Sequence, residues 1–211
     1  MLPDVFWGKL MGSFSRALKL TLGAACLIAT LLPASPASAA DESWDAPVSI
    51  GAVGPEPAGT VNAPTDLGLS AAPVVCFRGH VQDLGWMGWD CSDDGSWAFA
   101  GTTGQFRRLE AVEFFGNNTG GHTCMQAHVQ DVAWQATLCM GDGRVGRVGT
   151  TGQFRRIEAI RFGSTVRTTC AEAHVADLGW MGYRCNGAGI LTAVGTISQF
   201  RRMEALTGTI Q

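Results

Sequence analysis

One block of sequence occurs three times after residue 74, and no copy contains an internal gap. The copies align on His80, His128 and His174, which are 48 and 46 residues apart. Counted from each histidine, cysteines stand at −4 and +11, tryptophan at +6, Gly-Thr at +21 and Arg-Arg at +27. A unit of this length is too small to bury an apolar face alone, so we expect the copies to pack against one another.

Each copy shows the alternation of β-strands and no helical period. The positions at −3, −1 and +1 from each histidine are small or apolar, and they would share one face of a strand that points inward. These positions are Phe77, Gly79 and Val81, then Met125, Ala127 and Val129, and finally Ala171, Ala173 and Val175. With Gly-rich turns between the segments, the pattern predicts about four short strands per copy.

The expected fold is all-β. It is a single domain, 74–211, of three tandem repeats of ~46 residues at 74–115, 122–162 and 168–208. We expect the repeats to close around a common axis with pseudo-threefold symmetry. Two architectures fit this pattern, a β-prism with one sheet per repeat and a β-trefoil. The long final strand of each copy favours the β-prism-like arrangement.

Residues 1–40 have the features of a signal peptide. Three basic residues precede an apolar stretch at 20–32, and small residues follow at 34–40. The apolar stretch is shorter than the about 20 residues that span a bilayer, and a retained membrane anchor is the alternative. We predict cleavage after Ala39 or Ala40, export from the cell and no membrane span in the mature chain.

Residues 41–73 contain five prolines among alanine, glycine and acidic residues, and they keep no strand or helix period. This composition predicts an extended linker or arm. Trp44 and the short apolar patch at 48–50 are its candidates for docking on the rest of the chain.

The cysteines fit an oxidising compartment. Cys26 lies in the predicted signal peptide, which leaves six cysteines in the mature chain. If the segments flanking each turn form a hairpin, the two cysteines of one copy lie opposite each other. The alternative is a zinc cluster, but its cysteines would stand about two to four residues apart, and no such spacing occurs. The expected disulfides are Cys76–Cys91, Cys124–Cys139 and Cys170–Cys185.

The charge of the chain disfavours polyanionic partners. The formal net charge is −3, and removal of the signal segment with its three basic residues and one acidic residue leaves −5. The mature chain would have no lysine, and its basic residues would be 12 arginines besides histidine. We therefore expect neither nucleic acid nor an anionic membrane as a partner.

The residues resemble a known family. His-Val-Gln-Asp-Leu-Gly-Trp at 80–86, Gly-Thr-Thr-Gly-Gln at 101–105 and Arg-Leu-Glu-Ala-Val at 108–112 are similar to the ChW repeat, the clostridial hydrophobic repeat with conserved tryptophan. The resemblance extends from residue 74 to about residue 208. It implies a secreted or cell-surface module that binds extracellular partners or polymers without catalysis. The paired cysteines depart from the family's common pattern, and the first copy is the most complete.

Aromatic, histidine and arginine side chains are the candidates for ligand binding. An indole ring offers a broad apolar face and an N–H donor to a sugar ring, although a tryptophan beside a turn can equally cap the core. The histidines are alternatively held by a neighbouring turn, and Arg108 and Glu110 on one side of a strand are expected to neutralise each other. The expected ligand-binding residues are Trp86, Trp89, Trp134, Trp180, Tyr183, His80, His128, His174, Arg107, Arg155 and Arg201.

No copy contains an unrepeated nucleophile or carboxylate pair that could form a catalytic site. The mature cysteines are committed to disulfides, and no serine recurs in the register. We expect no catalytic residue, metal or cofactor. The expected function is a secreted, lectin-like, monomeric module that binds a glycan or cell-wall polymer through repeated sites. The alternative is an extracellular protein-interaction or structural surface protein, and a hydrolase is the least favoured possibility.

Overall fold

A computed structural model describes residues 43–211. The signal peptide predicted at 1–40 lies outside the described residues. The described part is all-β, with 16 strands and one short 3₁₀ turn, η1 (Asp93–Gly95). Within residues 43–211 no helix is long and apolar enough to cross a membrane.

Each copy contributes five strands. The first copy contains β2 (Val74–Val81), β3 (Gly85–Trp86), β4 (Asp90–Cys91), β5 (Ala98–Gly101) and β6 (Leu109–Asn117). The second contains β7 (His122–Val129), β8 (Ala133–Trp134), β9 (Leu138–Gly141), β10 (Gly146–Gly149) and β11 (Ile157–Ser164). The third contains β12 (Thr169–Val175), β13 (Gly179–Trp180), β14 (Arg184–Asn186), β15 (Ile190–Gly195) and β16 (Met203–Ile210).

The expected number of about four strands per copy was too low. In each copy the second arm of the first hairpin is interrupted after its tryptophan. In the first copy, Met87 N–H still donates to the carbonyl of Gly79, but regular pairing resumes only at Asp90. The arm is therefore divided into two short strands, β3 and β4.

The strands form three antiparallel sheets, and none of them closes on itself. Three sheets form from three copies, as expected for one sheet per repeat, but no sheet is built from one copy alone, because each takes a strand from another copy. In the first copy β2 pairs with β6, and the outer neighbour of β6 is β10 from the second copy. Likewise, β15 of the third copy pairs with β11, and β5 of the first pairs with β16. The exchanged strands provide each sheet with a partner along an edge that its own copy leaves open.

The core lies between the inward faces of these sheets. All nine positions predicted to face inward are buried. Phe77 of the first copy meets Phe162 of the second edge to face, with ring centroids 5.3 Å apart. Leu206 of the third copy is part of the same cluster. The three copies therefore share one hydrophobic core, as expected for units too small to fold alone.

The segment at 43–73 is extended and lies along the repeats. Its one short strand, β1 (Val48–Ser49), pairs with β15. Glu56 forms an ion pair with Arg144 at 2.9 Å. Further on, Leu67 and Leu69 pack on the outer side of the first copy, where Phe115 is buried. We call residues 43–73 the N-terminal arm.

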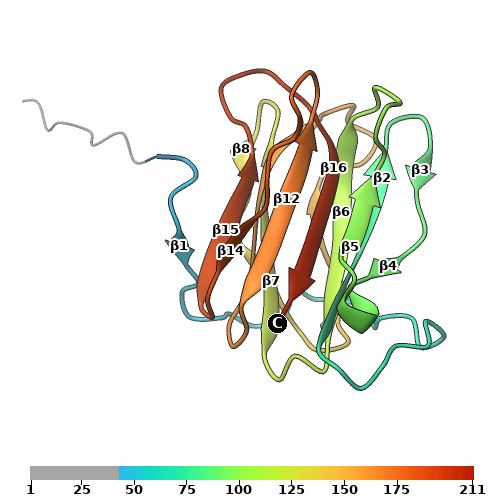
Figure 1. Cartoon of the computed structure of the whole chain (residues 1–211), viewed down its shortest axis with the longest axis vertical. Helices are drawn as coiled ribbons and strands as arrows, with labels where there is room; N and C mark the ends of the chain where they lie inside the picture. Colours follow the sequence, from blue (N-terminus) through green and yellow to red (C-terminus); the bar gives the residue numbers. More distant parts are fainter. Residues whose placement is uncertain (1–42) are drawn as a thin grey trace, which may run out of the picture. The chain divides into compact units, whose positions relative to one another are not determined.

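The first hairpin turn and the Arg-Arg loop of each copy lie at the same end of the strands. The strand that carries the histidine ends there, and the long final strand begins there, as β12 and β16 show most clearly (Figure 1). The tryptophan-bearing short strands β3, β8 and β13 pair with the last two residues of β2, β7 and β12. This arrangement places the repeated tryptophan, histidine and arginine residues toward one end of the domain.

Candidate functional site

Each long hairpin contains the same irregularity beside its histidine. In the first copy His80 pairs with Ala111 and Val81 pairs with Leu109, so Glu110 is an extra residue in a β-bulge. The equivalent bulges contain Glu158 and Glu204. A bulge re-aims the side chain of its extra residue. Here it holds a glutamate next to the histidine of the paired strand.

The bulged glutamate is the centre of an ion-pair network. In the first copy Arg108 Nη2 lies 2.7 Å from Glu110 Oε1, and His80 Nδ1 lies 3.1 Å from Oε2 without hydrogen-bond geometry. The second and third copies repeat the arginine contact, at 2.6 and 2.9 Å, and the histidine contact, at 3.1 and 3.3 Å. All three glutamates are buried. Because a buried carboxylate is costly without a partner, the arginine stabilises it in place.

The Gly-Thr motif of one copy closes onto the bulged glutamate of another. Thr150 N–H in the second copy donates to the backbone carbonyl of Glu110 at 2.9 Å. Thr196 and Thr102 make the same contact with Glu158 and Glu204. The preceding glycines have φ between +92° and +112°, and a Cβ at any of them would collide with that carbonyl. The motif is therefore a structural joint between copies, where only glycine fits.

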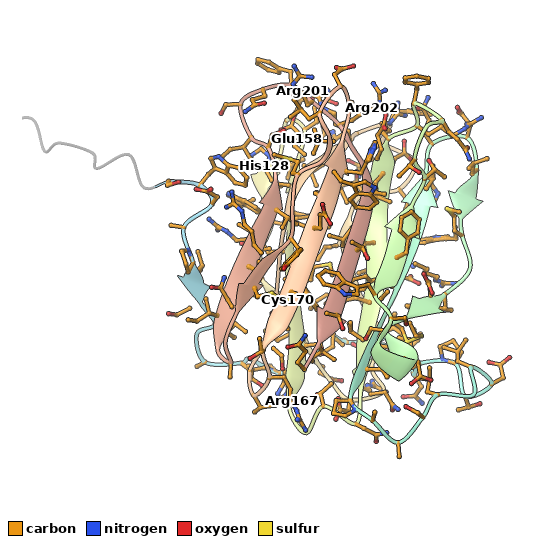
Figure 2. The ribbon with its side chains drawn as sticks, in the orientation of Figure 1. His128, Glu158, Arg167, Cys170, Arg201 and Arg202 are labelled. Atoms are coloured by element: carbon orange, nitrogen blue, oxygen red, sulfur yellow. A yellow bond between two sulfur atoms is a disulfide. The ribbon has the colours of Figure 1, made fainter. Side chains whose placement is uncertain are left out.

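Each histidine also packs edge-on against the tryptophan six residues later. The ring centroids are 5.2 to 5.3 Å apart in the three copies. The pKa of His128 is lowered from its ordinary value, mainly because burial disfavours the charged imidazolium; nearby Arg161 also lowers this pKa, while Glu158 opposes the shift. Figure 2 shows His128 and Glu158 below the Arg-Arg loop that contains Arg201 and Arg202. Among residues 43–211 no group of three or more His, Cys, Asp or Glu is placed to hold a metal ion.

The three tryptophans share this scaffold but have different neighbours. In the first copy, the guanidinium groups of Arg78 and Arg147 lie 5.2 and 5.0 Å from the centre of the Trp86 ring. Arg78 also lies 4.8 Å from the ring centre of Trp89. Both arginines pair with Glu113 at 2.5 Å. The indoles of the first copy are therefore half-buried in contact with protein cations.

In the second copy, the N-terminal arm reaches the tryptophan site. The Arg161 guanidinium lies 4.2 Å from the Trp134 ring centre, and its Nη2 donates to the carbonyl of Trp44 at 2.9 Å. The arm continues from there into β1, which extends the same sheet. Arg161 therefore contacts both the Trp134 ring and the N-terminal arm.

The third copy presents its tryptophan to solvent. Trp180 is 44% exposed and Tyr183 is 67% exposed. Phe99 meets Trp180 with ring centroids 6.4 Å apart, and Trp97 meets Tyr183 at 5.8 Å. Within the part of the chain that the structure describes, no arginine lies over any of these rings. We call these four aromatic residues the third-copy platform.

The exchange of strands explains why the platform is aromatic. Arg147 of β10 lies opposite Glu113 beside the first tryptophan, whereas Phe99 of β5 lies opposite Thr207 beside the third. Two residues before the histidine, Arg78 of the first copy is replaced by Glu172 in the third. The cations of the first copy are thereby replaced by a phenyl ring and a carboxylate.

The scaffold of the first copy matches a known family. The family model described as Clostridial hydrophobic W, or ChW, matches residues 80–114, which hold His80, Trp86, the Gly-Thr joint and the bulged Glu110. Because of this match, we refer to residues 80–114 as the ChW repeat. No curated protein and no solved structure matches the chain at a significant level. The second and third copies carry the same register as the ChW repeat, outside the matched residues.

Two of the arginines predicted to bind ligand are engaged by their own copies. In the ChW repeat, Arg107 Nη1 donates to the carbonyl of Gln82 at 2.9 Å and to Asp83 at 3.0 Å. Arg201 makes the same contacts with Ala176 and Asp177. Arg155 is half-buried and has no equivalent bond among the described residues. Arg107 and Arg201 therefore hold hairpin turns, and a role of all three arginines in ligand binding stays a prediction.

The structure confirms the three disulfides. Cys76–Cys91, Cys124–Cys139 and Cys170–Cys185 each join the arms of one hairpin across directly paired positions. In the first copy, Cys76 of the bridge lies four residues before His80 in β2, so the two side chains are on the same side of that strand. The bridges therefore hold the tryptophan-bearing arm against the histidine-bearing strand in every copy.

Sequence reasoning missed two groups of aromatic residues. Trp97 and Phe99 have no aromatic counterpart in the other copies, so the repeat register gave no signal for them. A second group does recur, because a phenylalanine precedes Arg-Arg in all three copies. These residues are Phe106, Phe154 and Phe200, and all of them are exposed. Their recurrence in the register of the ChW repeat was the signal that could have found them.

Proposed function

We propose that this chain is a secreted, non-catalytic module that binds a glycan or cell-wall polymer, and that the third-copy platform is its principal contact. The observation that carries the proposal is the exposure of Trp180 and Tyr183 beside two further aromatic rings. Exposed apolar rings of this size gain little stability for the fold, whereas they suit the C–H face of a sugar. The finer fold that we propose is the pseudo-threefold prism, supported by the exchange of strands between copies.

A carboxylate beside the platform would complete a sugar site. Glu172 Oε1 accepts a hydrogen bond from the N–H of Gly182 at 2.8 Å. No hydrogen bond to Oε2 is found among the described residues, so that oxygen can accept from a sugar hydroxyl. Ring stacking and a nearby carboxylate together favour a neutral or hydroxyl-rich polymer over a polyanion.

The networks around the histidines support the absence of catalysis. Each histidine packs against a tryptophan and faces a buried glutamate that an arginine already neutralises, so these contacts account for the histidine without a catalytic role. The six cysteines at 76–185 are all in disulfides, which support an oxidising, extracellular setting. The match to the ChW family supports an extracellular repeat module.

The proposal is tested with the mature chain on a glycan array and on purified cell-wall polymer. We expect binding to at least one neutral glycan and its loss, by at least tenfold in Kd, in Trp180→Ala/Tyr183→Ala. The matched control is Leu178→Ala, which removes a similarly exposed apolar side chain from the turn of the same hairpin. Capture of a surface protein with no glycan binding would support the interaction-protein alternative. Turnover in a hydrolase panel that is lost in His80→Ala would overturn the non-enzyme assignment.

A further inference from the structure

The three phenylalanines that precede Arg-Arg have an unusual backbone. Their φ angles are +56° at Phe106, +55° at Phe154 and +54° at Phe200, in the left-handed region. This conformation is unfavourable for a residue with a Cβ. The side chains are 77%, 79% and 84% exposed, so burial does not offset that cost. A strained and exposed phenyl group, present in all three copies, is an indication of function rather than of stability.

These residues converge on one pocket. The pocket has a volume of about 260 Å³ and is lined by residues of all three copies. Its principal lining residues are Phe106, Phe154, Phe200, Arg108, Arg156 and Arg202. Figure 2 shows Arg201 and Arg202 at this end of the domain, opposite the end that holds Arg167. The pocket shares no residue with the third-copy platform.

The arginines at this pocket keep donors for a ligand. Nε and Nη2 of Arg202 both face Oε1 of the buried Glu204. Arg108 makes the same pair of contacts with Glu110. No hydrogen bond from Nη1 of these two arginines is found among the described residues. A guanidinium has five N–H donors in a planar fork, so the donors on Nη1 remain available.

The remaining polar groups at the pocket are nearly balanced in charge. Arg156 Nη1 donates to the side-chain oxygen of Gln130 at 2.9 Å. Asp177 is the acidic residue at the rim, and Arg201 pairs with it at 2.9 Å. The pocket therefore presents guanidinium donors, and the buried carboxylates that pair with these arginines neutralise much of their positive charge. That arrangement suits one small anionic group more than a highly charged one.

We propose that this pocket binds a small organic anion, with the anionic group on Arg108, Arg156 and Arg202 and the apolar part between the three phenyl rings. Guanidinium groups hold carboxylate, phosphate and sulfate oxygens in the same way, so the shared chemistry is an oxyanion on an apolar body. The volume lies below the roughly 300–1,000 Å³ of sites for drug-sized ligands. The ligand is therefore a single ring or a short chain, or the end of a longer molecule.

The test uses the mature chain and four probes in NMR titrations. Benzoate and phenyl phosphate carry an oxyanion on a ring, benzyl alcohol carries the ring without charge, and acetate carries the charge without the ring. We expect one or both ring anions to bind at least tenfold more tightly than benzyl alcohol and acetate. We also expect their affinity to fall as salt concentration rises. The stronger of the two ring anions identifies the kind of oxyanion preferred.

The decisive variant replaces all three phenylalanines with glycine. Because glycine accepts a positive φ, Phe106→Gly/Phe154→Gly/Phe200→Gly is expected to keep the fold and to lose ring-anion binding by at least tenfold. The control is Val166→Ala, an exposed apolar residue next to Arg167 at the other end of the domain. Trp180→Ala is expected to leave anion binding unchanged, which separates this proposal from the glycan site.

Three results would overturn the proposal. The first is the absence of binding by both ring anions, and the second is equal binding of benzyl alcohol. The third is an unchanged affinity in the folded triple variant. Phenylalanine-dependent binding to phosphatidylcholine–phosphatidylglycerol vesicles, without binding of either ring anion, would assign the three rings to a lipid surface instead.

Discussion

Gly149 of the second copy packs directly against the backbone carbonyl of Glu110 in the first copy. Its φ is +92°, and a Cβ at this position would collide with that carbonyl. The next residue, Thr150, donates its N–H to the same oxygen. This contact joins one copy to the β-bulge of another, and the equivalent contacts at Gly101 and Gly195 join the other two pairs.

Because Gly149 packs so closely, adding a single methyl group at this position should strongly reduce the stability of the fold. Gly149→Ala should lower the free energy of unfolding by at least about 2 kcal/mol, because it adds a backbone collision to the left-handed strain. Gly152→Ala is the matched control, since Gly152 also has a positive φ but no atom near its Cβ, and about 1 kcal/mol is expected there. Denaturant unfolding measures both values. Equal losses of unfolding free energy in the two variants would contradict the close contact between Gly149 and Glu110.

In the second copy, the turn before the tryptophan contains a residue with an unfavourable backbone conformation. Ala133 has a φ of +66° where the first and third copies have Gly85 and Gly179, at +74° and +75°. Ala133→Gly should raise the free energy of unfolding by about 0.5–1 kcal/mol, since relief of strain exceeds the added entropy of the unfolded chain.

The reverse change, Gly179→Ala, should destabilise the third turn. No atom lies near the Cβ position of Gly179, so the expected cost of about 1 kcal/mol comes from the backbone conformation alone. Thermal and denaturant unfolding check both variants. A stabilising Gly179→Ala would show that these turns do not need a left-handed residue.

Acidification should weaken the fold through His128. The pKa of His128 is lowered in the folded chain, mainly by burial, so the unfolded chain takes up a proton at a higher pH than the native chain does. The contribution of His128 to the free energy of unfolding is therefore complete above the ordinary histidine pKa of about 6.5, and it is lost as the pH falls toward the pKa of the folded chain. NMR titration should place the His128 midpoint below 6.5. A midpoint at or above that value would contradict the assignment.

A second measurement separates His128 from the other groups that titrate in acid. The difference in unfolding free energy between pH 7.5 and pH 5.5 should be smaller in His128→Gln than in the wild-type chain. The glutamine keeps a polar group beside Glu158 but takes up no proton in this range. An unchanged difference would assign the acid sensitivity to another group.

The repeat register made much of the scaffold predictable. An offset of 15 residues between cysteines fixed the hairpin and its disulfide, and alternation around His80 identified the buried faces. The exchange of strands was not predictable by reading one copy at a time. The edge strand at 98–101 pairs with residues more than a hundred positions later, and local sequence carries no mark of that partner.

The candidate sites were less predictable than the fold. The register made the three tryptophans look equivalent, but their exposure depends on residues outside it. Arg147 and Phe99 occupy corresponding edge positions beside Trp86 and Trp180, and both are supplied by a different copy. The left-handed backbone at Phe106 was equally hidden, because phenylalanine is not a residue that indicates such a conformation.

We propose that the three copies share one scaffold and that only the third presents its tryptophan to a polymer. The affinity of Trp180→Ala and of Trp134→Ala for the same purified cell-wall polymer tests this, with near-native unfolding free energy checked for each variant. We predict at least a tenfold loss of affinity for Trp180→Ala and less than a twofold change for Trp134→Ala. Equal losses in the two folded variants would contradict the claim.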